Sequence, residues 1–515
     1  MADAHGLIVL GPDRLTPEQV VAVARRGARV EIGAQALDAV ARCREHVERH
    51  ACCGEPVYGV STGFGALAAR YIEPPLRRQL QQSLVRSHAA GSGDPVETEV
   101  VRAMMLLRLS TLCAGYSGVR TELVRAYADM LNARLTPIVP EYGSLGCSGD
   151  LAPLAHCALA LTGEGEVTDA QGRLLPAAEA LAAAGLAPVE LDEKEGLALI
   201  NGTDGMLGML VLAIADLHAL VRVADIAAAM SIEALLGTDC VMAAELQALR
   251  PHPGQAASAR NMARLLHGSS IMASHRTGDR RVQDAYSLRC APQVAGAMRD
   301  TLAHAETVAS RELHSVIDNP VVLPDGRTES NGNFHGAPLA YVLDFLAIAT
   351  ADLASIAERR TDRMLDADRS NGLPPFLAQD PGVDSGLMIA QYTQASIVSE
   401  MKRLAVPASV DSIPSSAMQE DHVSMGWSAG RKLRRSIDGL ARVLAVEVLA
   451  AARALELRTP LVPASGTAAA AAALRAVVPG IGPDRPVAPE IEAARETVVG
   501  GRLLAAVESV VGELE

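Results

Sequence analysis

The feature that most limits the fold is a series of long helix-like stretches beginning after residue 203. In each stretch Ala, Leu, Val and Met recur at the spacing that places apolar side chains on one face of a helix. The stretches cover 203–236, 291–316, 335–361, 386–405 and 419–456. Because Phe, Trp and Tyr together make up only 3% of the chain, an all-β fold is disfavoured. The sequence predicts a mainly α-helical protein built around a bundle of long helices.

The region before residue 203 has a different pattern. Between residues 55 and 205, glycine-rich turns separate short helical runs such as 98–112 and 121–132. Near the start, Thr16-Pro-Glu-Gln19 is a capping box with proline at the first helical position. From these changes in pattern we expect an N-terminal region over 1–202, a long-helix bundle over 203–456 and a C-terminal helical segment over 457–515.

Charge and cysteine spacing exclude several classes of partner. The 515-residue chain has a net charge of −14 with scattered basic residues, which is unlike a nucleic-acid-binding protein. The N-terminus lacks the basic start and apolar core of a signal peptide, and charged residues interrupt the most apolar stretch, 203–236. The eight cysteines form no CxxC pair, no HExxH motif is present, and no βαβ pattern follows the glycines of 202–208. We therefore expect a cytoplasmic protein that binds no membrane, metal or nucleotide.

The most unusual local sequence is the glycine-rich segment from Gly143 to Asp150, GSLGCSGD. Its spacing suits a flexible loop or an anion-binding nest. A nucleophile elbow fits less well, because GxSxG would need glycine where Asp150 stands. A third possibility is backbone cyclisation, in which the Gly149 amide nitrogen attacks the Cys147 carbonyl and Ser148 loses water to leave a methylidene group. Spacing alone does not choose among these.

The segment GSLGCSGDLAPLAH, residues 143–156, resembles the signature of the histidine and aromatic amino-acid ammonia-lyases. In that family an Ala-Ser-Gly tripeptide becomes the prosthetic group 4-methylidene-imidazol-5-one (MIO). Further matching blocks follow one another in the family's order along nearly the whole chain. They are YGVSTGFG (58–65), SHAAG (87–91), EGLALINGT (195–203), QDAYSLRC (283–290), NFHG (333–336) and PASVDSIP with QEDHVSM (407–425).

The resemblance implies a helical fold of the fumarase/aspartase-like type, a homotetramer with shared active sites, and an MIO group formed from Cys147, Ser148 and Gly149. The expected reaction is non-oxidative loss of ammonia from an amino acid. His88 and Glu420 resemble the ring-binding pair of the histidine-specific members, which implies conversion of L-histidine to trans-urocanate, the first step of histidine degradation. The alternatives are a tyrosine or phenylalanine ammonia-lyase or a 2,3-aminomutase. A helical binding protein without catalytic activity is the rival outside the enzyme class.

The family's catalytic roles fall on two tyrosines in addition to Ser148. Tyr58 resembles the base that removes the β-proton, with Tyr286 as a helper near the MIO group, although either tyrosine is a candidate for the base. A tyrosinate can act in this way if its neighbours lower its pKa from the ordinary value of about 10. Without the motif context, each of these tyrosines is better explained as a structural residue on a helix or loop.

The remaining family roles concern substrate binding. Arg289 resembles the arginine that holds the substrate carboxylate through its bidentate fork, with Gln283 in support. Asn201 resembles the amide that contacts the MIO oxygen or the substrate amine, and Phe334 an apolar wall. His88 and Glu420 are expected to hydrogen-bond the two ring nitrogens of histidine.

The chain departs from the family pattern at several positions. Cys147 replaces the usual alanine, but its side chain lies outside the ring being formed, so cyclisation is expected to proceed. Ala285 stands where proline is common, and Met401 and Met418 stand where asparagine is common in many members. These departures bear on specificity and rate rather than on the class of reaction.

Overall fold

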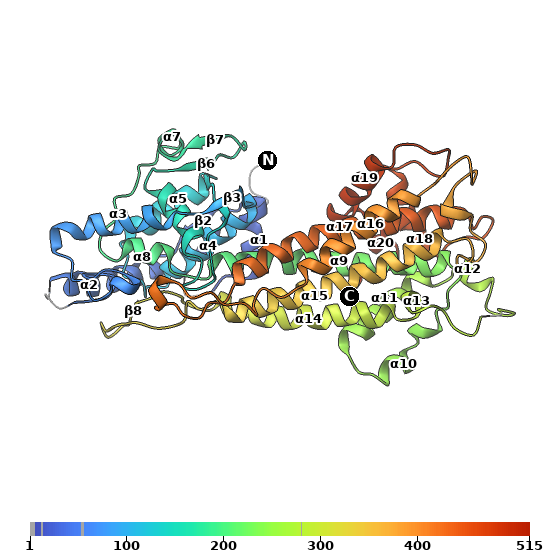
Figure 1. Cartoon of the computed structure of the whole chain (residues 1–515), viewed down its shortest axis with the longest axis horizontal. Coiled ribbons are helices and arrows are strands. Elements are labelled where there is room, and N and C mark those ends of the chain that lie inside the picture. Colours follow the sequence, from blue (N-terminus) through green and yellow to red (C-terminus); the bar gives the residue numbers. More distant parts are fainter. Residues whose placement is uncertain (1–5, 12–13, 53–55, 280) are drawn as a thin grey trace. The chain divides into compact units, whose positions relative to one another are not determined.

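The structure is a computed structural model that describes residues 6–11, 14–52, 56–279 and 281–515 (Figure 1). It is mainly helical, as predicted, with only short strands. The α-helices are α1 (Pro17–Arg26), α2 (Ala34–Cys52), α3 (Arg77–His88), α4 (Thr98–Cys113), α5 (Thr121–Asn132), α6 (Leu151–Leu161), α7 (Ala177–Ala183), α8 (Glu195–Ile200), α9 (Asp204–Ala234), α10 (Ala244–Ala248), α11 (Pro253–Leu266), α12 (Ser270–Ala273), α13 (Tyr286–Arg289), α14 (Ala291–Leu313), α15 (Ala337–Leu365), α16 (Met388–Leu404), α17 (Gly426–Glu456), α18 (Ser465–Arg475), α19 (Ala488–Val499) and α20 (Arg502–Val511).

The strands of the described part form small sheets, and short 3₁₀ helices lie in the loops. The strands are β1 (Ile8–Leu10), β2 (Val30–Ile32), β3 (Ser92–Pro95), β4 (Thr136–Pro137), β5 (Pro140–Tyr142), β6 (Glu166–Thr168), β7 (Leu174–Pro176), β8 (Val321–Val322) and β9 (Thr328–Glu329). β1 and β2 pair in parallel, β3 with β5 and β8 with β9 are antiparallel, and β4, β6 and β7 form an antiparallel three-stranded sheet. The 3₁₀ helices are η1 (Gly65–Leu67), η2 (Pro74–Leu76), η3 (Cys240–Met242), η4 (Pro375–Leu377) and η5 (Ser416–Met418).

The chain divides into two compact units, each assembled from separate parts of the sequence. Unit 1 comprises Met1–Leu212, Glu306–Asp344 and Pro407–Arg431. Unit 2 comprises Ala213–Ala305, Phe345–Val406 and Lys432–Glu515. Four of the five boundaries fall within long helices, α9, α14, α15 and α17, so each of these helices contributes residues to both units, and the fifth falls in the loop after α16.

The helical periodicity located the long helices well, with one error. The predicted stretches 203–236, 291–316, 335–361 and 386–405 correspond to α9, α14, α15 and α16, which confirms them. The stretch predicted to begin at 419 is wrong at its start, because α17 begins only at Gly426. Residues before Gly426 are held by loop contacts instead, since Met425 N–H donates to Leu145 O at 2.8 Å and Ser424 Oγ–H to Gly146 O at 2.7 Å.

The first helix confirms its predicted capping signals. The Thr16 side chain accepts from the Gln19 N–H at 3.3 Å, while the Gln19 side chain accepts from the Thr16 N–H at 3.0 Å. Gly27 ends the helix in the left-handed conformation with a φ of 69°. These bonds satisfy backbone groups that the helix ends would otherwise leave unpaired.

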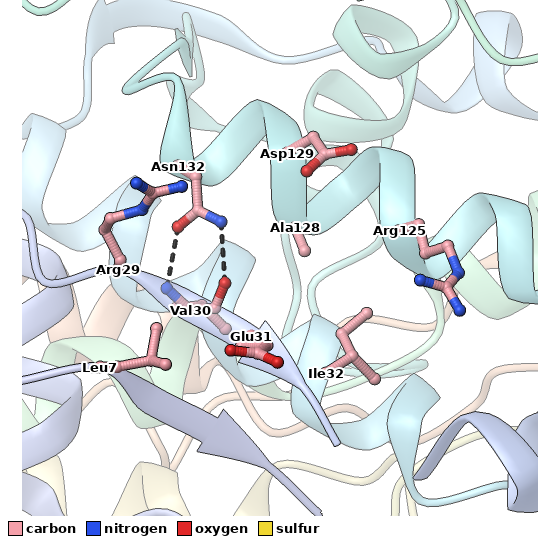
Figure 2. A pocket seen from close by; sticks show the side chains of 9 residues that line it. All are labelled: Leu7, Arg29, Val30, Glu31, Ile32, Arg125, Ala128, Asp129 and Asn132. Carbon is pink, nitrogen blue, oxygen red and sulfur yellow. Dashed lines mark hydrogen bonds between the residues drawn. The ribbon is translucent and has the colours of Figure 1, made fainter. Parts of the chain in front are cut away.

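Side chains complete the short strands of unit 1. β2 pairs with β1 on one edge, and on the other edge the Asn132 amide donates to Val30 O and accepts from Val30 N–H, both at 2.8 Å (Figure 2). Asn132 therefore takes the place of a third strand at this point. A cavity of about 620 Å³ lies beside β2 and α5, and none of the predicted site residues lines it.

The interior of unit 1 carries polar groups that tie distant segments together. Trp427, the only tryptophan, is 2% exposed and donates from Nε1 to Glu141 O at 2.7 Å, which fixes the start of α17 against β5. Arg108 on α4 is fully buried and donates to the carbonyl oxygens of Asn201 at 2.6 Å and Ile317 at 2.7 Å. Because burial of an unpaired charge is costly, these bonds hold the backbone at Asn201 strongly.

Two helices of the described part, α9 and α15, are long and apolar enough to cross a membrane. In their most apolar windows, 72% and 61% of the residues are buried inside the structure. Burial of this extent is typical of core helices.

Candidate active site

The predicted MIO segment is a closed loop between β5 and α6. Ser144 Oγ–H donates to Asp150 Oδ1 at 2.9 Å and accepts from the Gly146 N–H at 3.1 Å. The second carboxylate oxygen of Asp150 accepts from the N–H groups of Gly205 at 2.9 Å and Met206 at 3.0 Å, at the start of α9. Asp150, at the end of the loop, therefore bonds both to Ser144 near the start of the loop and to the N-terminus of α9. Burial raises the pKa of Asp150 to about 7.

Gly149 lies directly against the backbone of Gly202. Its φ is 75°, and a Cβ atom at this position would lie 2.1 Å from Gly202 O. The next residue, Asp150, donates its N–H to Gly202 O at 2.7 Å. Only glycine fits here, because both the left-handed backbone and the close approach exclude a side chain.

The two residues before Gly149 differ in exposure. Ser148 is half-buried, and Cys147 is 8% exposed. Burial, with a smaller contribution from the negative charge of Glu420, raises the pKa of the Cys147 thiol to about 11. The thiol is therefore protonated at neutral pH and is a poor nucleophile.

Asn201, which directly precedes Gly202, carries a buried acceptor. The residue is 4% exposed, and its Oδ1 atom has no hydrogen-bond partner among the residues that the structure describes. Unpartnered buried polar atoms are rare in native proteins, so this acceptor indicates a site for a ligand that carries a hydrogen-bond donor.

Glu420 acts electrostatically on two other residues predicted to contact the substrate, Tyr58 and His88. In each case burial is the largest cause of the pKa shift, and the negative charge of Glu420 is a smaller contribution that favours a higher pKa. For Tyr58 the larger cause is burial, which also raises the pKa, whereas the Gly65 N–H, 3.2 Å from the phenolic oxygen, lowers it. For His88 burial outweighs the other causes and lowers the pKa. His88 is thus favoured in its neutral form.

The tautomer of neutral His88 follows from its hydrogen bonds. Nδ1 lies 2.9 Å from Leu84 O, and a carbonyl oxygen can only accept, so Nδ1 carries the hydrogen. Nε2 is then an acceptor. Glu420 accepts the Ser415 hydroxyl at 2.8 Å through one carboxylate oxygen.

Two further loops meet the MIO segment at one atom. Gly146 O accepts from the Gly336 N–H at 3.0 Å, in the loop 331–336 that carries half-buried Phe334, and from Ser424 Oγ in the loop 415–425. The second of these loops contains Ser416, Ala417 and Met418 at φ values of 49°, 51° and 69°. Such conformations cost free energy in residues with side chains and cluster at functional sites.

The other predicted residues form a cluster of their own in unit 2. Arg289 Nη1 donates to Gln283 Oε1 at 2.7 Å, and the guanidinium carbon lies 4.8 Å from the centroid of the Tyr286 ring. Tyr286 is 72% exposed. Within the described part of the chain, Arg289 Nε is buried and has no hydrogen-bond partner. The cluster has the donors that a carboxylate requires.

The structure therefore brings together eight of the predicted residues in unit 1 and the remaining three in unit 2. Unit 1 holds Tyr58, His88, Cys147, Ser148, Gly149, Asn201, Phe334 and Glu420. Sequence reasoning assigned no role to Ser144 or Asp150, which close the loop. The only signal for them was their place inside the glycine-rich segment, because their partners on α9 become neighbours only in the folded chain.

Comparison with known proteins agrees with this arrangement. Residues 15–476 match the family model of the aromatic amino acid lyases. The chain is 65% identical over 508 residues to the histidine ammonia-lyase of Streptomyces coelicolor, covering 98% of this chain and 99% of the relative.

Solved structures give the same result for the fold. The histidine ammonia-lyase of Trypanosoma cruzi superimposes with a TM-score of 0.91 at 36% identity, over 99% of this chain and 96% of that one. The tyrosine aminomutase of Streptomyces globisporus gives 0.93 at 38% identity, over 99% and 100%. The predicted helical fold of the fumarase/aspartase-like class is confirmed. The chain belongs to the aromatic amino acid lyase family.

Proposed function

We propose that this chain is a histidine ammonia-lyase, which eliminates ammonia from L-histidine to give trans-urocanate. Two lines of support combine: the high identity to histidine ammonia-lyases over the full length, and the grouping of His88 and Glu420 around the Ser148 loop. The second of these carries the choice of substrate, because a carboxylate and a neutral imidazole suit a ring that bears N–H donors.

We further propose that Cys147, Ser148 and Gly149 form an MIO group. The residues present fit such a group, since Gly149 lies in a space where no Cβ fits, and the buried Asn201 directly precedes Gly202, whose backbone Gly149 contacts. In its formation the Gly149 nitrogen bonds to the Cys147 carbonyl carbon, and one water leaves from that carbon and one from Ser148. The Asn201 side-chain N–H would donate to the oxygen of the group, and its Oδ1, unpartnered in the described part, would accept from the substrate amine. When present, it supplies an electrophile that takes up the substrate amine and makes it a better leaving group.

The substrate ring is bound by two acceptors. His88 Nε2 is an acceptor because Nδ1 donates to Leu84 O, and Glu420 is an acceptor as a carboxylate. Two acceptors match an imidazolium ring with both nitrogens protonated better than a phenol or a phenyl ring. The charge of Glu420 would stabilise that cation, and the cation in turn makes the neighbouring β-hydrogen easier to remove.

Tyr58 is the proposed base, with Tyr286 as its helper. In the free site the pKa of Tyr58 is raised by burial and by Glu420, so the base needs compensation from a positive charge. The bound imidazolium supplies that charge. The Gly65 N–H, which donates to the phenolic oxygen, stabilises the phenolate as well.

Arg289, supported by Gln283, is the proposed carboxylate clamp, since its Nε is buried and unpaired among the described residues. By analogy with the family, the protein would assemble as a homotetramer in which different subunits contribute to each active site. We propose that Gln283, Tyr286 and Arg289 of one subunit complete a site formed by Tyr58, His88 and Glu420 of another.

Substrate kinetics test the proposal. The kcat/KM values for L-histidine, L-tyrosine and L-phenylalanine are compared in the wild type, in His88→Leu and in Glu420→Gln. We expect turnover of histidine alone by the wild type, and a loss of about 10- to 100-fold in each variant. Turnover of tyrosine or phenylalanine instead would assign the chain to another activity of the same family, and a β-amino acid product would identify an aminomutase.

A further inference from the structure

His335 lies where two loops of the candidate site meet. Its neighbour Phe334 belongs to the loop 331–336, and the ring of His335 reaches the loop 415–425 that carries Glu420. His335 Nε2 lies 3.3 Å from His422 O, and the two imidazole rings stack at a centroid distance of 5.7 Å with an interplanar angle of 11°. No role in the reaction has been given to either histidine above.

The hydrogen bonds of His335 fix its tautomer. Ala337 N–H donates to His335 Nδ1 at 3.3 Å, so Nδ1 is unprotonated. His422 O can only accept, so Nε2 carries the hydrogen. The ring therefore uses one nitrogen to order its own loop and the other to hold the opposite loop.

Both loops are also tied to the MIO segment through Gly146 O, as described above. These bonds to Gly146 O fix each loop near its C-terminal end, at Gly336 and at Ser424. Glu420 lies four residues before Ser424 and two residues after the left-handed residues 416–418. The bond from His335 Nε2–H to His422 O holds the loop 415–425 at a point two residues after Glu420. The bond from Ser424 to Gly146 O lies four residues after Glu420 and does not hold the loop at this point.

We propose that His335 is a positioning residue for the substrate ring: its Nε2–H bond to His422 O holds the Glu420 loop at the correct separation from the Phe334 loop. This inference rests on the proposed function and adds to it a determinant of ring recognition. Binding of the substrate ring depends on the bond from His335 to His422 O. Binding of the substrate amino and carboxyl groups does not, because Asn201 and Arg289, which are proposed to hold them, lie outside these two loops.

Two substitutions at His335 separate its two bonds. In His335→Asn the short side chain can still accept from the N–H two residues ahead, in the manner of an Asx turn, but cannot reach His422 O. In His335→Gln the longer amide carries both an acceptor and a donor and can keep the bond to His422 O. His422→Ala is the matched control on the other loop, because it removes the ring stacking and leaves the backbone carbonyl in place.

The experiment measures KM and kcat for L-histidine, and inhibition by imidazole and by L-alanine, which represent the ring and the amino-acid end separately. For His335→Asn we expect KM and the imidazole inhibition constant to rise about tenfold, with kcat and L-alanine inhibition within about twofold of wild type. His335→Gln and His422→Ala should stay within about threefold of wild type.

Unchanged imidazole inhibition in His335→Asn would overturn the inference, and so would equal weakening of imidazole and L-alanine. A KM for His335→Gln as high as that of His335→Asn would show that the bond to His422 O is not the cause. Wild-type turnover of L-histidine, measured first, reports on the proposed function separately. Thermal unfolding of each variant shows whether the fold is retained.

Discussion

Replacement of Asn201 by alanine should separate activity from stability. The Oδ1 atom of Asn201 is buried and unpartnered in the described part of the chain, and an unsatisfied buried acceptor costs about 1–3 kcal/mol. Alanine removes that cost and loses about 1 kcal/mol of packing. The free energy of unfolding should therefore stay the same or rise by up to about 2 kcal/mol. If the amide contacts the reacting group, kcat should fall by about 10²- to 10³-fold.

Asn132 provides the matched control in the same unit. Its amide makes two bonds of 2.8 Å to Val30 (Figure 2), so Asn132→Ala should lose about 1–3 kcal/mol of stability and keep its kcat. Thermal unfolding and steady-state kinetics of the two variants, measured in parallel, check the expected changes in stability and in kcat. The reasoning is refuted if Asn201→Ala loses as much stability as Asn132→Ala, or if it keeps the wild-type kcat.

Three further substitutions test other parts of the site. Glu420→Gln removes a negative charge that favours a higher pKa for Tyr58 and for His88. Both pKa values should therefore fall, and the acid limb of the pH profile of kcat/KM should move to lower pH. A move to higher pH would contradict this. Met418→Asn should raise the free energy of unfolding by about 1 kcal/mol, because Met418 is exposed at a φ of 69°, where asparagine is better tolerated than methionine. Urea unfolding measures this free energy, and a less stable variant would contradict the prediction. Gly149→Ala would place a Cβ 2.1 Å from Gly202 O, so its intact mass should equal the encoded mass, and a mass lower by two waters would show that the close approach is not required.

The sequence predicted the long helices from periodicity, since apolar faces that repeat over many turns leave few alternatives. It failed at residues 419–425, where an apolar-polar pattern continues but the backbone turns away from helix. There Ser424 and Met425 bond the loop at Gly146 and Leu145. These partners lie far away in the sequence, so no local pattern reveals them.

The candidate site could be predicted as a set of residues but not as an arrangement. Motif resemblance identified His88, Asn201 and Glu420, whereas the Nδ1–H tautomer of His88 and the orphaned Asn201 oxygen required coordinates. The closing role of Asp150 also depends on tertiary contacts with the start of α9. The family resemblance thus predicted which residues take part, and only the folded structure showed their protonation and hydrogen-bond geometry.

The most direct test of the central claim is the ultraviolet absorbance of the purified protein with L-histidine, run beside Ser148→Ala. The absorbance band of urocanate should grow with the wild type and stay flat with Ser148→Ala. An equal rate in the two proteins would contradict the role of Ser148. A flat trace for a wild-type protein that has lost two waters from its encoded mass would contradict histidine as the substrate.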